Sequence, residues 1–88
     1  MSVILWLSAN LCRLAKGKEG FEVDGETTGE CINDLVTIIP AMRGTILLGS
    51  RLSPNVQVEV NKQSVDEEER LTKKVNDGDE IRVMYKGY

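Results

Sequence analysis

Two stretches in the last third of the chain alternate apolar and polar residues with a period of two. The first is Val-Gln-Val-Glu-Val at residues 56–60, and the second is Glu-Ile-Arg-Val-Met at residues 80–84. This period places successive side chains on opposite faces of a β-strand, so each stretch offers one face to a core. Gly78, within the Asp-Gly-Asp sequence at 77–79, can adopt the positive φ of a tight turn. The pattern predicts two half-buried strands, the second introduced by a turn.

The first 24 residues predict a strand, a helical turn and a second strand. Residues 3–8 are rich in strand-favouring types and are apolar on both faces. Residues 10–16 suit a single helical turn that is stopped by Gly17. Residues 21–24 alternate again and are expected to close an antiparallel hairpin with the first strand.

The main helix is predicted to begin at Thr27. Thr27 as N-cap and Glu30 three residues later form a capping box, in which each side chain satisfies a free amide at the helix start. Pro40 is expected to end the helix. Apolar residues recur at spacings of three and four and predict one buried face: Cys31, Ile32, Leu35, Ile38 and Ile39.

The middle of the chain gives weaker signals. A short helical segment is expected at 42–48 and a tight turn at 61–62, where Asn tolerates the left-handed conformation. The acidic run at 66–69 is interpreted as a solvated loop, or as a surface that steers a basic partner. Arg43 and Arg51 are either solvated loop charges or contacts for an acidic partner surface.

Composition excludes several classes of function. The 14 acidic residues exceed the 11 basic ones, which are not clustered, so nucleic acid is not expected as a partner. The chain has no histidine, which excludes a hydrolase triad and any imidazole metal site; no catalytic residue and no metal ligand is predicted. Cys12 and Cys31 are expected to be reduced and structural. Residues 1–7 lack a basic leader and their apolar run is short, which favours a cytoplasmic protein without a membrane segment.

Hairpin, helix and further strands together predict an α+β domain spanning residues 1–88, with a mixed sheet on one main helix. The V-x-V-N turn, the acidic loop, the D-G-D-E-hydrophobic strand and the short tail resemble the MoaD/ThiS family of sulfur carriers. That resemblance implies a ubiquitin-like β-grasp fold of four to five strands and a protein that is not itself an enzyme. It also implies a role in biosynthesis of molybdenum cofactor or thiamin type.

The resemblance further implies how the carrier works. Family members end in Gly-Gly, and an E1-like adenylating enzyme uses ATP to activate the terminal carboxylate, which becomes a thiocarboxylate. A sulfurtransferase or the large subunit of a synthase is the other expected partner. This chain reads Lys86-Gly87-Tyr88. Gly87 is therefore the expected sulfur-carrying residue if Tyr88 is removed, and the chain itself is expected to bind no cofactor.

The resemblance also places residues 3, 5 and 7 inward, so that Ile4 and Trp6 lie on the open face of the sheet. Trp6 is either covered by its neighbours or part of an apolar patch with Ile4 and Met84. The predicted partner-docking residues are Ile4, Trp6, Arg82, Met84, Tyr85 and Lys86. Two other functions stay open at this point: a β-grasp interaction module that has lost sulfur chemistry, and an unrelated small α+β domain.

Overall fold

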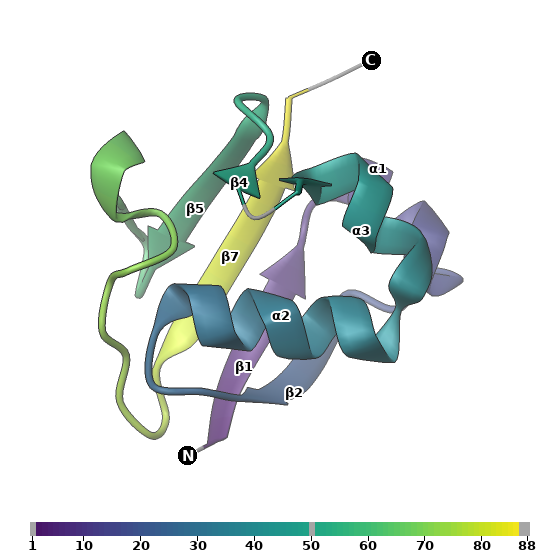
Figure 1. Ribbon diagram of the computed structural model, residues 1–88. Helices are drawn as coiled ribbons and strands as arrows, with labels where there is room; N and C mark the ends of the chain where they lie inside the picture. The colour runs from purple at the N-terminus through teal and green to yellow at the C-terminus, as the bar shows by residue number, and fades with distance from the viewer. Residues whose placement is uncertain (1, 50, 87–88) are drawn as a thin grey trace.

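A mixed five-stranded sheet covered on one face by a helix forms the body of the protein (Figure 1). The computed structural model describes residues 2–49 and 51–86. The strand order is β2-β1-β7-β5-β6. The strands are β1 (Ser2–Leu7), β2 (Gly20–Asp24), β5 (Val56–Val60), β6 (Gln63–Ser64) and β7 (Glu80–Tyr85).

The two strands at the centre of the sheet come from opposite ends of the chain. β1 runs parallel to β7, and both also have antiparallel neighbours, β2 beside β1 and β5 beside β7. The predicted alternation is confirmed, because residues 3, 5 and 7 of β1 and residues 81 and 83 of β7 are buried. Gly78 has φ 89° in the turn before β7, as its position in the sequence indicates. The sheet therefore has one face against the core and one open face.

Helix α2 (Thr28–Ile38) packs across the inner face of the sheet, and the predicted capping box is present. The Thr27 hydroxyl accepts from the Glu30 amide at 3.2 Å. The Glu30 carboxylate accepts from the amide of Glu26 at 2.9 Å, one residue before the N-cap amide that the capping-box pattern predicts. Both bonds satisfy amides that the helix cannot pair internally.

The predicted buried face of α2 is correct except at its end, where Ile38 is exposed and Ile39 follows the helix and is only partly buried. Cys31, Ile32 and Leu35 are buried, as is Val36, which the sequence pattern missed. Ile38 is 49% exposed. At 3.6 residues per turn, its side chain lies about 90° from the centre of the buried face, so it falls outside the contact with the sheet. Pro40 follows the helix end and starts the 3₁₀ turn η2 (Pro40–Met42).

Short elements connect the larger ones. α1 (Ala9–Cys12) and the 3₁₀ turn η1 (Arg13–Ala15) follow β1, and Lys16 and Gly17 end them with positive φ. The helical prediction for 42–48 holds only for α3 (Arg43–Ile46). Leu47 and Leu48 instead form strand β3, which pairs with β4 (Arg51–Leu52). This difference arises because Gly49 has a positive φ of 65° and turns the chain back on itself.

The loop between β6 and β7 is tied to the start of α2. Asn61 and Lys62 have positive φ in the predicted turn, which joins β5 to β6. In the loop after β6, the acidic run forms the exposed 3₁₀ turn η3 (Glu67–Glu69). The amides of Thr28 and Gly29 donate to the carbonyls of Lys73 and Leu71, both at 2.9 Å. Amides at the helix start therefore find their partners in this loop rather than in water.

Among residues 2–49 and 51–86, no helix combines the length and the apolar character needed to cross a bilayer.

Candidate functional site: the end of the last strand and the open face

The end of β7 is held on both sides, by side chains that follow β1 and by a backbone carbonyl that precedes β5. The amide of Tyr85 donates to the Ser8 hydroxyl at 3.2 Å, and the side-chain amide of Asn10 donates to the Tyr85 carbonyl at 2.8 Å. On the other side, the amide of Lys86 donates to the Asn55 carbonyl at 2.8 Å. Hydrogen bonds therefore continue to the last described residue, and the backbone leaves the sheet in a defined direction.

Figure 1 shows this exit at one end of the sheet, opposite the N-terminus of β1. Gly87 and Tyr88 lie outside the described residues, so the predicted sulfur-carrying residue is located only through its neighbour, Lys86. The hydrogen-bonding residues Ser8, Asn10 and Asn55 were not predicted from the sequence. Small polar residues beside turns are common, and only the topology shows that these three meet at the end of β7.

The open face carries four of the predicted docking residues. Ile4 and Trp6 alternate with the buried positions of β1, and Arg82 and Met84 alternate with those of β7. Trp6 lies beside Arg82 in the parallel register, and Arg82 lies opposite Glu59 of β5. Ile4 has Glu22 on one side and Glu80 on the other. The open face is thus mixed, with apolar side chains separated by charges of both signs.

Trp6 is fixed by its neighbours and still partly accessible. Its indole nitrogen donates to a Glu80 carboxylate oxygen at 2.8 Å, and 36% of the residue is exposed. The ring lies over Gly20 on β2, where an added Cβ would come within 2.7 Å of it. A glycine opposite an aromatic residue lets the ring lie flat across the neighbouring strand. Neighbouring side chains therefore cover Trp6 in part, as the first alternative expects, and its role in docking stays a prediction.

Tyr85, also predicted to take part in docking, lies on the inner side of the sheet and not on the open face; its role in docking stays a prediction. Tyr85 pairs with Val56, which is buried, and its own side chain packs against the hydrophobic core. The reason is the strand period: residues 81, 83 and 85 share the inner face, whereas residues 82 and 84 share the open one. Lys86 is exposed and follows the strand end. The sequence-based list grouped residues by their nearness to the tail and did not separate the two faces.

A shallow depression of about 170 Å³ lies beside Trp6 on this face. Its lining includes Trp6, Glu59, Lys62 and Arg82. The depression is smaller than a typical ligand pocket of about 300–1,000 Å³. Trp and Arg, which line it, are residue types enriched at protein interfaces.

Neither cysteine offers a reactive thiolate. Both are free and buried, as the sequence analysis expects. Burial raises the pKa of the Cys31 thiol to about 11, and the carboxylate of Glu30 adds to the effect. Burial likewise raises the pKa of Cys12, with a further contribution from Glu19. Both side chains are protonated at neutral pH and act as small apolar residues.

The mixed sheet, the helix across one of its faces and the parallel pairing of the first and last strands define a class: a ubiquitin-like β-grasp protein. The sequence profile of the ThiS family matches residues 5–85, and the chain belongs to that family. The proteins of this family are small ubiquitin-like carriers or modifiers, so the chain has a sulfur-carrier-like role and is not itself an enzyme. No curated protein sequence is detectably similar to the chain.

Solved structures show the same fold at low sequence identity. CysO in the Amycolatopsis orientalis BexX/CysO complex superposes with a TM-score of 0.86 at 22% identity, covering 98% of this chain and 97% of that one. SAMP1 from Haloferax volcanii gives 0.84 at 24% identity, covering 97% and 94%. A chain in the complex of subunits 1 and 2 of the Helicobacter pylori molybdopterin-converting factor superposes with a TM-score of 0.64 at 14% identity, covering 97% of this chain and 93% of that one. The first and third of these structures are complexes with a partner protein.

Proposed function

We propose that this protein is a sulfur carrier for the biosynthesis of a sulfur-containing cofactor, of molybdenum cofactor or thiamin type, with Gly87 as its activated terminus. The observation that carries this proposal is the held exit of β7. Backbone hydrogen bonds hold the end of β7 as far as Lys86, the residue that precedes Gly87 in the sequence. Membership of the ThiS family adds the expected chemistry.

The carrier needs cleavage after Gly87, because the reacting carboxylate must belong to that residue. A carboxylate oxygen of Gly87 then attacks the α-phosphorus of ATP within an E1-like adenylating enzyme, and pyrophosphate leaves. Sulfide displaces AMP and gives the thiocarboxylate directly. If the donor is instead a persulfide on the sulfurtransferase, its terminal sulfur displaces AMP to form an acyl disulfide, and a thiol reductant cleaves the S–S bond to release the thiocarboxylate. The absence of a Cβ at Gly87 allows the backbone to enter a narrow partner channel. This chain supplies the acyl group and the docking surface, and its partners supply the catalytic groups.

The test is carrier-dependent exchange of pyrophosphate into ATP by the adenylating enzyme of the same host. The chain cut after Gly87 is expected to support exchange, since it presents a free glycine carboxylate. An enzyme that binds this chain and shows no exchange would reject the carrier function.

A second candidate function is an interaction module that keeps the docking face without sulfur chemistry. Two observations favour it: the sequence has Tyr88 where family members have the second glycine, and the open face holds a fixed, accessible tryptophan. Binding that is unaffected by Gly87→Ala, in a chain that is never thiocarboxylated in its host, would support this alternative.

The open face is expected to dock the partner in either case, with Trp6 as its strongest contact. Trp6→Ala should weaken binding to the adenylating enzyme about 30-fold, because a fixed aromatic ring at an interface typically contributes about 2 kcal/mol. The free energy of unfolding should fall by only about 1 kcal/mol, since one exposed hydrogen bond and part of the ring contact are lost. Titration calorimetry and urea unfolding measure the two effects.

Ile38→Ala is the matched control, because Ile38 is an exposed apolar side chain on α2, in the opposite layer. It should leave binding unchanged. Unchanged binding by Trp6→Ala, together with a large loss of stability, would show that Trp6 serves only the fold.

A further inference from the structure

The direction in which the chain leaves β7 depends on the segment 53–56. The bond from the Lys86 amide to the Asn55 carbonyl continues the β5–β7 ladder one step beyond its last registered pair, Val56 and Tyr85. In an antiparallel ladder such a bond fixes the backbone of one strand against the other. The position of Asn55 therefore sets the position of the Lys86 backbone.

The outer edge of β5 has no strand partner next to Asn55. Carbonyls two residues apart along a strand point to the same edge. At that edge the Val58 carbonyl accepts from the Val65 amide at 2.9 Å, whereas the Val56 carbonyl accepts from Nη1 of Arg70 at 2.6 Å. The guanidinium thus occupies the place that the next amide of a neighbouring strand would take.

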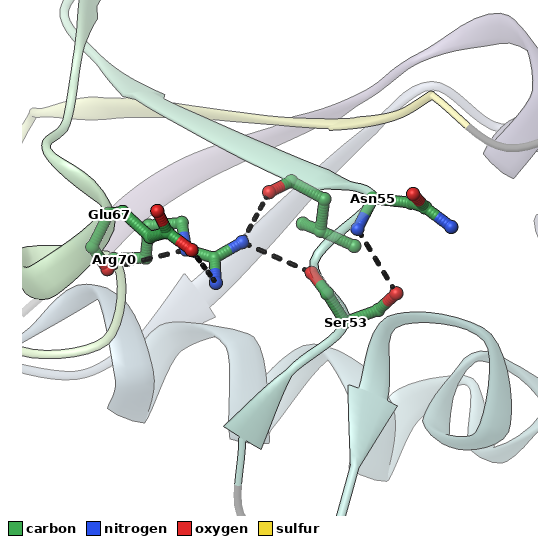
Figure 2. Close-up of polar contacts among 5 residues, drawn as sticks. Ser53, Asn55, Glu67 and Arg70 are labelled. Carbon is green, nitrogen blue, oxygen red and sulfur yellow. Dashed lines mark hydrogen bonds and ion pairs between the residues drawn. The ribbon is translucent and has the colours of Figure 1, made fainter.

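The same nitrogen of Arg70 also donates to the Ser53 carbonyl at 3.1 Å, so that one side chain holds both ends of the segment around Asn55 (Figure 2). Ser53 and Val56 are buried, and the Arg70 side chain is only 15% exposed. Loss of the guanidinium would leave the Val56 carbonyl without its donor in a poorly hydrated place, which is costlier than loss of an exposed contact. The ion pair with Glu67 is weak by comparison, at 4.0 Å with a carboxylate side chain that is 83% exposed.

The backbone of Arg70 is in turn held by residues at the start of α2. Its carbonyl accepts from the Thr28 hydroxyl at 2.8 Å, and the next carbonyl, of Leu71, accepts from the Gly29 amide. The backbone of Arg70 is thereby fixed to the first turn of α2 while its side chain reaches the segment 53–56. A continuous set of hydrogen bonds connects α2, Arg70, the segment 53–56 and Lys86.

We propose that Arg70 is a positioning residue for the end of β7: it holds Asn55 so that Lys86 stays in line with the strand. This inference rests on the proposed function for its consequence: a pre-ordered exit lowers the entropy cost of inserting the terminus into the adenylating enzyme. Arg70 acts through Asn55 and makes no contact with the reacting atoms.

Amide hydrogen exchange of the intact chain tests the structural part. In Arg70→Met, the Lys86 amide should exchange about 10-fold faster or more relative to amides in the middle of β7, which report global unfolding. Arg70→Lys, whose ammonium keeps three donors on a shorter side chain, should restore part of the protection. Glu67→Gln is the matched control and should leave Lys86 unchanged. If the methionine variant does not fold, Arg70→Gln, which is too short to bridge both carbonyls, gives the same comparison.

Kinetics with the adenylating enzyme test the functional part. For chains cut after Gly87, Arg70→Met should raise the KM for the carrier about 10-fold and leave kcat unchanged, because the ordering cost falls on binding. Unchanged Lys86 exchange would overturn the inference, and so would an unchanged KM despite lost protection. A wild-type chain that is not adenylated at all would reject the proposed function instead, and the exchange result alone would then decide the role of Arg70.

Discussion

A chain cut after Gly87 is expected to be adenylated about 100-fold faster or more than a chain that retains Tyr88. In the longer chain the terminal carboxylate belongs to a residue with a bulky ring, and it lies one residue beyond the position of the glycine carboxylate. A misplacement of about 1 Å at a reacting centre can cost about 100-fold in rate, and a whole residue is a larger displacement. ATP–pyrophosphate exchange at equal carrier concentrations measures the ratio.

Gly87→Ala in the cut chain separates the effect of a side chain on the terminal residue from the effect of the extra residue. It keeps the correct length and adds only a methyl group, so its rate should lie between those of the other two chains. Equal rates for the cut chain and the chain with Tyr88 would show that the adenylating site is not selective for a terminal glycine, and would remove the need for cleavage.

Gly29→Ala is expected to lower the free energy of unfolding by about 2 kcal/mol, as the net of two opposing terms. Alanine favours the helix by about 1 kcal/mol over glycine. Against this, a Cβ at Gly29 would overlap the carbonyl oxygen of Leu71, which is backbone and accepts from the Gly29 amide itself. The loop must move away from α2 to make room for the Cβ. This overpacking costs about 1–3 kcal/mol, and it weakens the neighbouring hydrogen bonds.

Thermal unfolding followed by circular dichroism should show this as a fall in Tm of roughly 10 °C for a domain of this size. Gly44→Ala is the matched control, because Gly44 also lies in a helix, α3, and a Cβ there meets nothing within 4 Å. That variant should be as stable as the wild type or more stable by up to about 1 kcal/mol. A Gly29→Ala chain as stable as Gly44→Ala would show that the loop's attachment to α2 adds little stability.

Local patterns predicted the secondary structure well where a single physical signal was dominant. The valines of β5 and the capping box at Thr27 each depend on a few adjacent residues, and the structure confirms both. The prediction that Ile38 is buried was wrong. Its spacing of three from Leu35 continues the apolar pattern in the sequence, but its angle around the helix places it at the margin of the buried face.

The site was less predictable because it depends on pairing between distant strands. Which face Tyr85 occupies follows from its alternation with Val83 and its pairing with Val56, and nearness to the tail concealed this. Arg70 carried no recognisable signal, since an arginine after an acidic run is usually solvated. β6 ends before it reaches Val56, so the Val56 carbonyl accepts from Arg70 and not from an amide of a neighbouring strand.

Whether this protein carries sulfur on Gly87 is read from the intact mass of the protein purified from its native host. A sulfur carrier should appear there as a chain that ends at Gly87, with a fraction heavier by the difference between one sulfur atom and one oxygen atom. A protein that retains Tyr88 and carries no added sulfur, in cells that must synthesise the sulfur-containing cofactor to grow, would contradict the carrier function.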